Sequence, residues 1–270
     1  MKDIEYARPE GKPQRLDLYF PEKADRPLPL IIWIHGGGWL EGGKGLEGVK
    51  GGDHPVVGQL QRGYAVASIE YRLSPEAKWP AQIFDCKAAV RFLRANAKRY
   101  NLDPGRFGVW GDSAGGHLAA MVGVSGGVKE LEGDLGNPGV SSSVQAVCDW
   151  YGPTDLTVIQ KTPNNAVGPV SQLIGGPIAE NLEKARTASP INYVTRNTPA
   201  FLIMHGDQDE TVPINQSELL NEALQKAGAW VKFVRVQGAK HGGPDFAGFN
   251  NPTILTMIEQ FFDEHLQAPG

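Results

Sequence analysis

The segment from Phe107 to Ala120 contains the residues best suited to nucleophilic chemistry. It reads FGVWGDSAGGHLAA, so Ser113 stands between Gly111 and Gly115, after a short apolar run and before an alanine-rich stretch. A Gly-x-Ser-x-Gly turn between a strand and a helix exposes the serine hydroxyl above the carboxyl ends of the strands, at a helix N-terminus. The spacing therefore predicts that Ser113 is a nucleophile. A glycine-rich turn with no chemical role is the alternative.

A run of three glycines follows the apolar segment that ends at Ile34, in the sequence HGGGW at residues 35–39. Successive glycines let backbone N–H groups come close to a substrate oxygen, and such donors stabilise the oxyanion of a tetrahedral intermediate. We expect the N–H groups of Gly37, Gly38 and Ala114 to form this oxyanion hole. Phosphate binding fits less well, because the run lacks the spacing of nucleotide-binding loops.

A nucleophilic serine needs a base, and His241 is the best of the six histidines. It lies in the sequence GAKHGGP just after the last predicted strand, so it follows both the serine and an acidic loop. Serine, acid, histidine is the chain order of the α/β-hydrolase triad. The other histidines precede the acid or lie inside a predicted helix: His35, His54, His117, His205 and His265.

The acid that orients this histidine should lie in FLIMHGDQDETVP, at residues 201–213, where a predicted buried strand is followed by three acidic residues. A carboxylate there accepts the Nδ1–H of the base and stabilises the imidazolium that forms during the reaction. Spacing alone does not choose among Asp207, Asp209 and Glu210. One of them is expected to bond only to loop N–H groups.

Four aromatic residues near the glycine run or the ends of predicted strands are candidates for a substrate pocket, with burial in the core as the alternative. They are Trp39, Trp79, Trp150 and Tyr151. The two cysteines, Cys86 and Cys148, are far apart and without histidines at metal spacing, so neither a metal site nor a disulfide scaffold is expected.

Short apolar runs alternate with helical patterns along the chain, which is typical of a mainly parallel sheet flanked by helices. The predicted strands are Arg15–Phe20 at an edge, Leu28–His35, Tyr64–Ile69, Phe107–Trp110, Val144–Trp150, Ala200–His205 and Trp230–Val236. The predicted helices are residues 80–97, Ala114–Val124, Pro213–Lys226 and Pro252–His265. The carboxyl ends of parallel strands meet at one edge, so the candidate residues should gather there.

The residues from Tyr151 to Pro199 do not fit a simple crossover, because 49 residues separate two consecutive predicted strands. Long connections of this kind are usually functional, so residues 151–199 are a candidate lid or pocket wall. A surface excursion with a helix near Ala179–Arg186 is the alternative. We expect residues 1–270 to form one domain.

Composition limits the class of protein. Lys and Arg minus Asp and Glu give 26 − 30 = −4, and a pI near 5.9 argues against nucleic-acid partners. The chain lacks an apolar run near the ~20 residues of a membrane span. We expect a soluble protein, cytoplasmic if the chain begins at Met1 and secreted if a leader was removed; the oligomeric state is not indicated.

The chain resembles the α/β-hydrolase superfamily, and within it the hormone-sensitive-lipase-like carboxylesterases and the bacterial deacetylase and feruloyl esterase group. The matching segments are residues 35–39, 71–94, 103–120, 205–213 and 240–243. The resemblance implies that Asp209 is the triad acid, that Asp207 structures the loop, and that no metal or organic cofactor takes part. Only 34 residues precede His35, too few for the N-terminal cap of the lipase-like members, so their acyl-pocket rules are not carried over.

The sequence therefore predicts a serine carboxylesterase with the triad Ser113, Asp209 and His241. Its expected substrates are small-molecule or carbohydrate esters with short acyl groups, including acetyl or feruloyl esters of plant polysaccharides, cleaved through an acyl-enzyme. Two alternatives stay open. The same triad serves peptidases and thioesterases, and a ligand-binding protein of this fold would use the pocket without the chemistry.

Overall fold

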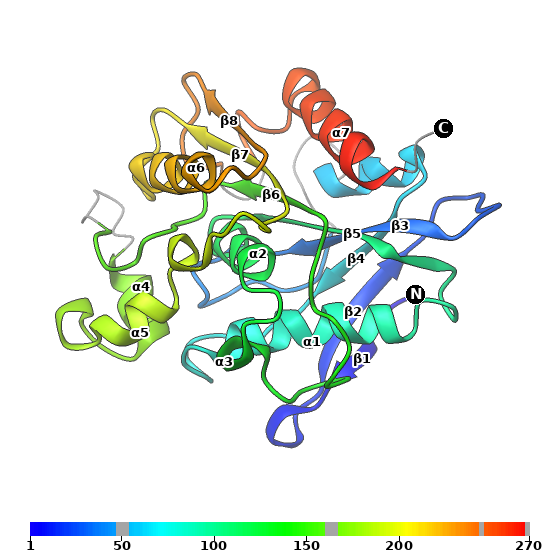
Figure 1. Cartoon of the computed structure of the whole chain (residues 1–270), viewed down its shortest axis with the longest axis horizontal. Helices are drawn as coiled ribbons and strands as arrows, with labels where there is room; N and C mark the ends of the chain where they lie inside the picture. The colour runs from blue at the N-terminus through cyan, green and yellow to red at the C-terminus, as the bar shows by residue number, and fades with distance from the viewer. Residues whose placement is uncertain (47–53, 160–166, 243–245, 268–270) are drawn as a thin grey trace.

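A computed structural model describes residues 1–46, 54–159, 167–242 and 246–267 of the chain (Figure 1). Eight strands form one sheet in the order β1-β2-β4-β3-β5-β6-β7-β8. β1 and β2 run antiparallel to their neighbours, and the strands from β4 to β8 are parallel, so the expected mainly parallel sheet is confirmed. The strands are β1 (Ile4–Ala7), β2 (Gln14–Tyr19), β3 (Leu28–Ile34), β4 (Ala65–Ile69), β5 (Leu102–Asp112), β6 (Ala146–Trp150), β7 (Ala200–Gly206) and β8 (Val231–Val236).

Helices cover both faces of the sheet, because its central strands are apolar on both sides. Side chains of α1, α2 and α6 belong to the hydrophobic cluster on one face, and those of α7 and η2 to the cluster on the other. The α-helices are α1 (Ala81–Ala95), α2 (Ala114–Val124), α3 (Lys129–Glu132), α4 (Val167–Ile174), α5 (Leu182–Thr187), α6 (Asn215–Ala227) and α7 (Pro252–Leu266). The 3₁₀ helices are η1 (Pro9–Gly11), η2 (Pro55–Arg62), η3 (Ile178–Glu180) and η4 (Pro190–Tyr193).

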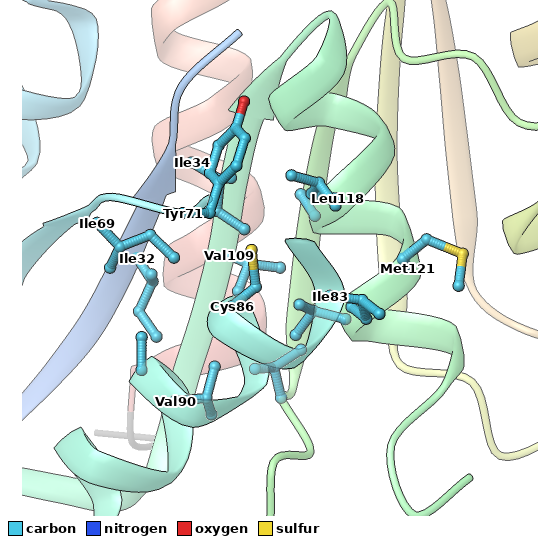
Figure 2. Packing of buried hydrophobic residues seen from close by; sticks show 14 of the residues in the cluster. Ile32, Ile34, Ile69, Tyr71, Ile83, Cys86, Val90, Val109, Leu118 and Met121 are labelled. Carbon is cyan, nitrogen blue, oxygen red and sulfur yellow. The ribbon is translucent and has the colours of Figure 1, made fainter. Parts of the chain in front are cut away.

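Strand β3 illustrates why helices must pack on both faces of the sheet. All seven of its residues are buried, and alternate side chains enter opposite clusters. Figure 2 shows Ile32 and Ile34 on the face that packs against α1 and α2, near Ile83 and Leu118. Trp33 lies in the other cluster. The central strands that carry the candidate nucleophile are therefore held from both sides.

The prediction that residues 15–20 form an edge strand is wrong. These residues form β2, and β1 pairs with its outer side in a register that shifts between Glu5 and Ala7. The four residues of β1 are too short for an alternating pattern to stand out. Strand β5 also begins earlier than predicted, at Leu102. The prediction left out its first residues because Pro104 and Gly105 are typical of a turn.

The connection after β6 contains ordered helices. The helix predicted near residues 179–186 appears as η3 and α5, whereas α4 was not expected, since its Gly168 and Pro169 resemble helix breakers. Proline is tolerated in the first turn of a helix, where α4 carries it. Residues 160–166 of this connection lie outside the described part of the chain. Among the described helices, none combines the length and apolar character needed to cross a membrane.

Candidate active site

Ser113 lies in the turn between β5 and α2, in the middle of the sheet. Its backbone has φ 54° and ψ −118°, a strained conformation for a residue with a side chain. The Ser113 N–H donates to the carbonyl oxygen of Trp150 at 2.8 Å, and its own carbonyl accepts from His117 N–H at 3.0 Å. The strain is thus held by β6 on one side and by the first turn of α2 on the other.

Gly115 is required by the close approach of this turn to β3. A Cβ at position 115 would lie 2.0 Å from the carbonyl oxygen of Ile34 and 2.6 Å from that of His35. No side chain fits at these distances, because both neighbours are backbone atoms that cannot rotate away. The second glycine of the Gly-x-Ser-x-Gly pattern therefore allows the nucleophile turn to sit against the residues that begin the HGGGW loop.

The structure brings Ser113, His241 and Asp209 together. Ser113 Oγ lies 2.8 Å from His241 Nε2, and His241 Nδ1 lies 2.7 Å from Asp209 Oδ2. These distances are those of a nucleophile, a general base and an orienting acid. The side chain of His241 is 17% exposed and that of Asp209 is fully buried, so a substrate can reach the base and not the acid.

Two loops at adjacent strand ends hold the acid and the base. The loop after β7 carries Asp209 and the loop after β8 carries His241. Backbone hydrogen bonds join them: Asp207 N–H donates to Val236 at 3.3 Å and Gln208 N–H donates to Ala239 at 2.9 Å. The distance between Asp209 and His241 is consequently set by the pairing of β7 with β8.

The structure separates the three acidic residues that spacing left open. Asp207 Oδ1 accepts from the N–H of Gly238 at 2.8 Å, which is a loop-structuring contact. Glu210 is exposed. Asp209 Oδ1 accepts from the N–H groups of Thr211 and Val212, at 2.8 and 2.9 Å, which leaves Oδ2 directed at His241.

The charge on Asp209 depends on its hydrogen bonds. Burial by itself would raise the pKa of Asp209, but hydrogen bonds from His205 and His241 outweigh burial and hold that pKa well below its usual range. Asp209 therefore stays ionised across the neutral range, as the orienting acid of a serine triad must.

The HGGGW loop turns sharply beside Ser113. Gly37 and Gly38 have φ 97° and 61°, and the carbonyl of Gly37 accepts from the N–H groups of Leu40 and Glu41. The N–H of Gly36 donates to Asp112 Oδ1 at 2.9 Å, so it faces a carboxylate and not a substrate. Burial raises the pKa of Asp112 to about 6.

A small cavity of about 40 Å³ opens at the nucleophile. Two of the three expected oxyanion donors, Gly38 and Ala114, line it, while Gly37 does not. The connection after β6 contributes lining residues to this cavity from both sides of its undescribed part, residues 160–166. This connection therefore lies against the candidate site. The lining residues are Gly38, Trp39, Ser113, Ala114, Pro153, Ile159, Pro169, Val170, Thr211 and Val212.

The four aromatic pocket candidates have different positions. Trp39 lines the cavity. Tyr151 is buried with its ring 4.8 Å from that of His241, so it packs behind the base. Trp150 is fully buried in the cluster under α7, 4.9 Å from Trp110, because the two-residue period of β6 turns it to that face. Trp79 is buried and donates to Thr187 Oγ1 at 3.1 Å.

Trp39 is held by a histidine for which the sequence suggested no role. The indole N–H of Trp39 donates to His117 Nδ1 at 3.2 Å, and His117 Nε2 lies 2.7 Å from the carbonyl of Ala188. His117 thus links the cavity wall, helix α2 and the connection after β6. Burial lowers the pKa of His117 to about 4, so this residue is neutral at pH 7.

The segment predicted as a pocket wall, residues 151–199, contributes Pro153, Ile159, Pro169 and Val170 to the cavity lining. The sequence did not single out these residues or Val212, because they carry no chemistry and form no motif. His205 was set aside because it precedes the acid, although it stands four residues before Asp209 and contacts it.

A second cavity is larger, about 340 Å³, and is lined by Arg91, Glu132 and residues 138–143 among others. It shares no residue with the cavity at Ser113. Within the described residues, no group of three or more His, Cys, Asp or Glu side chains could hold a metal ion. We therefore place the candidate active site at the smaller cavity, which Ser113 lines.

Comparison with known proteins gives matches along most of the chain. The model of the BD-FAE family matches residues 16–224. The esterase LipC of Mycobacterium tuberculosis is 34% identical over 222 residues, which cover 80% of this chain and 53% of LipC. The chain thus spans about half the length of this curated relative.

Two solved structures superpose on nearly the whole chain. A truncated form of a carbohydrate esterase from gut microbiota has a TM-score of 0.85 at 35% identity, covering 98% of this chain and 95% of that chain. A bifunctional GH43-CE protein of Bacteroides eggerthii has a TM-score of 0.84 at 37% identity, covering 98% of this chain and 35% of that chain.

Replacing the acid should separate the roles of the two aspartates. We expect Asp209→Asn to lower kcat/KM for a 4-nitrophenyl ester by up to ~10⁴-fold, because an amide holds the histidine in the wrong tautomer. Asp207→Asn should retain most of the activity, since Asp207 bonds to the N–H of Gly238 and not to His241. Equal losses, or a larger loss in Asp207→Asn, would contradict the assignment.

Buried, neutral His117 should make stability depend on pH. Its pKa is about 4 in the folded chain, against ~6.5 for an unperturbed histidine. Between these values the unfolded chain binds a proton that the folded chain does not, so acidification destabilises the fold. From pH 6.5 to 5, the free energy of unfolding should fall less steeply in His117→Asn than in the wild-type protein. The two slopes should differ by up to ~1.4 kcal/mol per pH unit. Urea unfolding at several pH values tests this, and parallel curves for the two proteins would refute it.

Proposed function

Because the chain belongs to the BD-FAE family of α/β-hydrolase carboxylesterases, we propose that it hydrolyses short-chain carboxylic esters with Ser113 as the nucleophile. The observation that carries the proposal is the unbroken series of contacts from Ser113 Oγ through His241 to the buried carboxylate of Asp209, beside a cavity. The relatives named as esterases support the same reaction class.

The proposed reaction has two halves. In the first, His241 Nε2 accepts the proton of Ser113 as Oγ attacks the ester carbonyl, and then delivers that proton to the departing alcohol. In the second, a water loses a proton to His241 and attacks the acyl carbon. The bond to Ser113 Oγ then breaks as His241 returns that proton to Oγ, which releases the acid and restores Ser113. Asp209 keeps His241 in the tautomer with Nδ1–H throughout, through the 2.7 Å contact.

The negative charge of each tetrahedral intermediate needs backbone donors. Gly38 and Ala114 line the cavity next to Ser113, so we assign their N–H groups to the oxyanion, with Gly37 as a third candidate. A well-placed donor of this kind lowers the barrier by ~3–4 kcal/mol. The close approach of the turn at Gly115 to Ile34 and His35 supports this assignment, because it brings Ala114 near the start of the HGGGW loop.

The acyl group is proposed to be short. The cavity at Ser113 is small, about 40 Å³, so it suits an acetyl group better than a feruloyl group. Its walls are mostly apolar and include Trp39, Ile159 and Val170. We propose that residues 151–199 act as the pocket wall and that the alcohol side of the ester is a carbohydrate, in line with the carbohydrate esterase structure that the chain resembles.

A hydrolysis screen tests the reaction class. We expect turnover of 4-nitrophenyl acetate and release of acetate from acetylated xylan, with methyl ferulate, a peptide amide and an acyl thioester as alternative substrates. Ser113→Ala is the control and should lose nearly all of this turnover, because the nucleophile is absent. Activity retained in Ser113→Ala, or cleavage of the peptide or thioester alone, would refute the proposed function.

Chain length tests the size of the pocket. Across 4-nitrophenyl esters from acetyl to decanoyl, kcat/KM should be highest between acetyl and butyryl and should then fall. Each added CH₂ contributes ~0.8 kcal/mol only while it is buried, and the cavity has little room for more. A kcat/KM that still rises beyond the octanoyl ester would reveal a deep acyl tunnel and contradict the prediction.

A further inference from the structure

A second histidine, His205, contacts the proposed triad acid from inside the protein. His205 lies near the end of β7 and is completely buried. Its Nε2 lies 3.1 Å from Asp209 Oδ2 and 2.9 Å from the carbonyl oxygen of Val212. Its Nδ1 lies 2.7 Å from the hydroxyl oxygen of Ser217, on α6. Each ring nitrogen therefore has a partner, and one partner is the oxygen that also binds His241.

These contacts decide where His205 carries a proton. Nε2 faces two oxygens that can only accept, the Val212 carbonyl and the Asp209 carboxylate, so Nε2 must be protonated for the contacts to be attractive. The Ser217 hydroxyl can donate or accept, and it suits either state of Nδ1. A ring turned by 180° would direct one carbon at the carboxylate and another at the Ser217 hydroxyl. The contact with Ser217 therefore also fixes the orientation of the ring.

The carboxylate of Asp209 is consequently held at both of its oxygens. Oδ1 accepts from the N–H groups of Thr211 and Val212, whereas Oδ2 accepts from His205 on one side and His241 on the other. Without His205, Asp209 Oδ2 would keep, of these contacts, the one with His241. Oδ1 would still be held by two N–H groups, but Oδ2 would lose its second contact, and the direction of the acid relative to the base would be less well defined.

We propose that His205 is a positioning residue for ester hydrolysis: its Nε2–H fixes Asp209 Oδ2 in the orientation that aligns His241 with Ser113. The inference rests on the proposed function, because it gives His205 its role through the triad. His205 does not touch the substrate cavity and is not itself a catalytic residue. The resulting series runs from Ser217 on α6 through His205, Asp209 and His241 to Ser113.

Two substitutions at position 205 form a matched pair. In His205→Gln the side-chain amide nitrogen can reach the place of Nε2 and donate to Asp209. In His205→Asn the shorter amide reaches only the place of Nδ1, next to Ser217. Both variants bury a neutral amide in place of the ring, so they carry similar costs of packing. His265→Asn, on α7 and away from the site, controls for loss of a histidine and should leave activity unchanged.

We expect His205→Asn to lower kcat by about 10–100-fold with little change in KM, the range for a misaligned reacting group. His205→Gln should recover most of kcat at a similar Tm. The downfield NMR signal of the His241 Nδ1–H proton should stay visible in His205→Gln and broaden or vanish in His205→Asn. A purely structural role would instead lower Tm and activity together in both variants.

Equal kcat values in the two variants, whether high or low, would overturn the inference. If neither variant folds, ¹⁵N NMR of histidine-labelled wild-type protein decides the question: Nε2 of His205 should carry a proton at pH 7, and an unprotonated Nε2 would overturn it. Failure of the proposed function looks different, because then wild-type protein hydrolyses no ester or Asp209→Asn is as active as wild type.

Discussion

The close contact between the turn at Ser113 and the end of β3 is the constraint on which the site depends. Gly115 leaves room for the carbonyl oxygens of Ile34 and His35, which a Cβ would meet at 2.0 and 2.6 Å. Because β3 continues directly into the HGGGW loop, the same contact sets the strained turn at Ser113 and the HGGGW loop side by side. Large aromatic side chains on the far face of the sheet, including Trp33 and Trp110, support both strands from beneath.

The acid and the base are positioned by the neighbouring part of the sheet. Their loops follow β7 and β8, which pair in parallel, and backbone hydrogen bonds join the loops just beyond the strands. The carboxylate of Asp209 is buried and therefore costly to ionise, yet four N–H donors surround its two oxygens. Burial with full hydrogen bonding gives a carboxylate that is both charged and fixed in direction, and His205 belongs to that arrangement.

The proposed triad and the cavity wall come from different parts of the chain. Ser113, Asp209 and His241 follow strand ends of the sheet, whereas most of the cavity wall comes from the connection after β6 and from the loop at Thr211 and Val212. His117 joins the two parts, since it binds the indole of Trp39 and the carbonyl of Ala188. Changes in the connection can therefore alter the cavity wall while Ser113, Asp209 and His241 keep their geometry.

Features that arise from neighbouring residues can be predicted from the amino-acid sequence: the strand, turn and helix around Ser113, the glycine run, and most central strands. These follow from local spacing and from hydrophobic period. Local spacing leaves Asp207, Asp209 and Glu210 equivalent, and no sequence pattern reveals β1, α4 or the contact of His205 with Asp209. The sequence also offered Trp150 as a pocket residue, although β6 turns that side chain into the core. These points depend on strand pairing and helix packing, which determine which face a side chain occupies and which distant groups it meets.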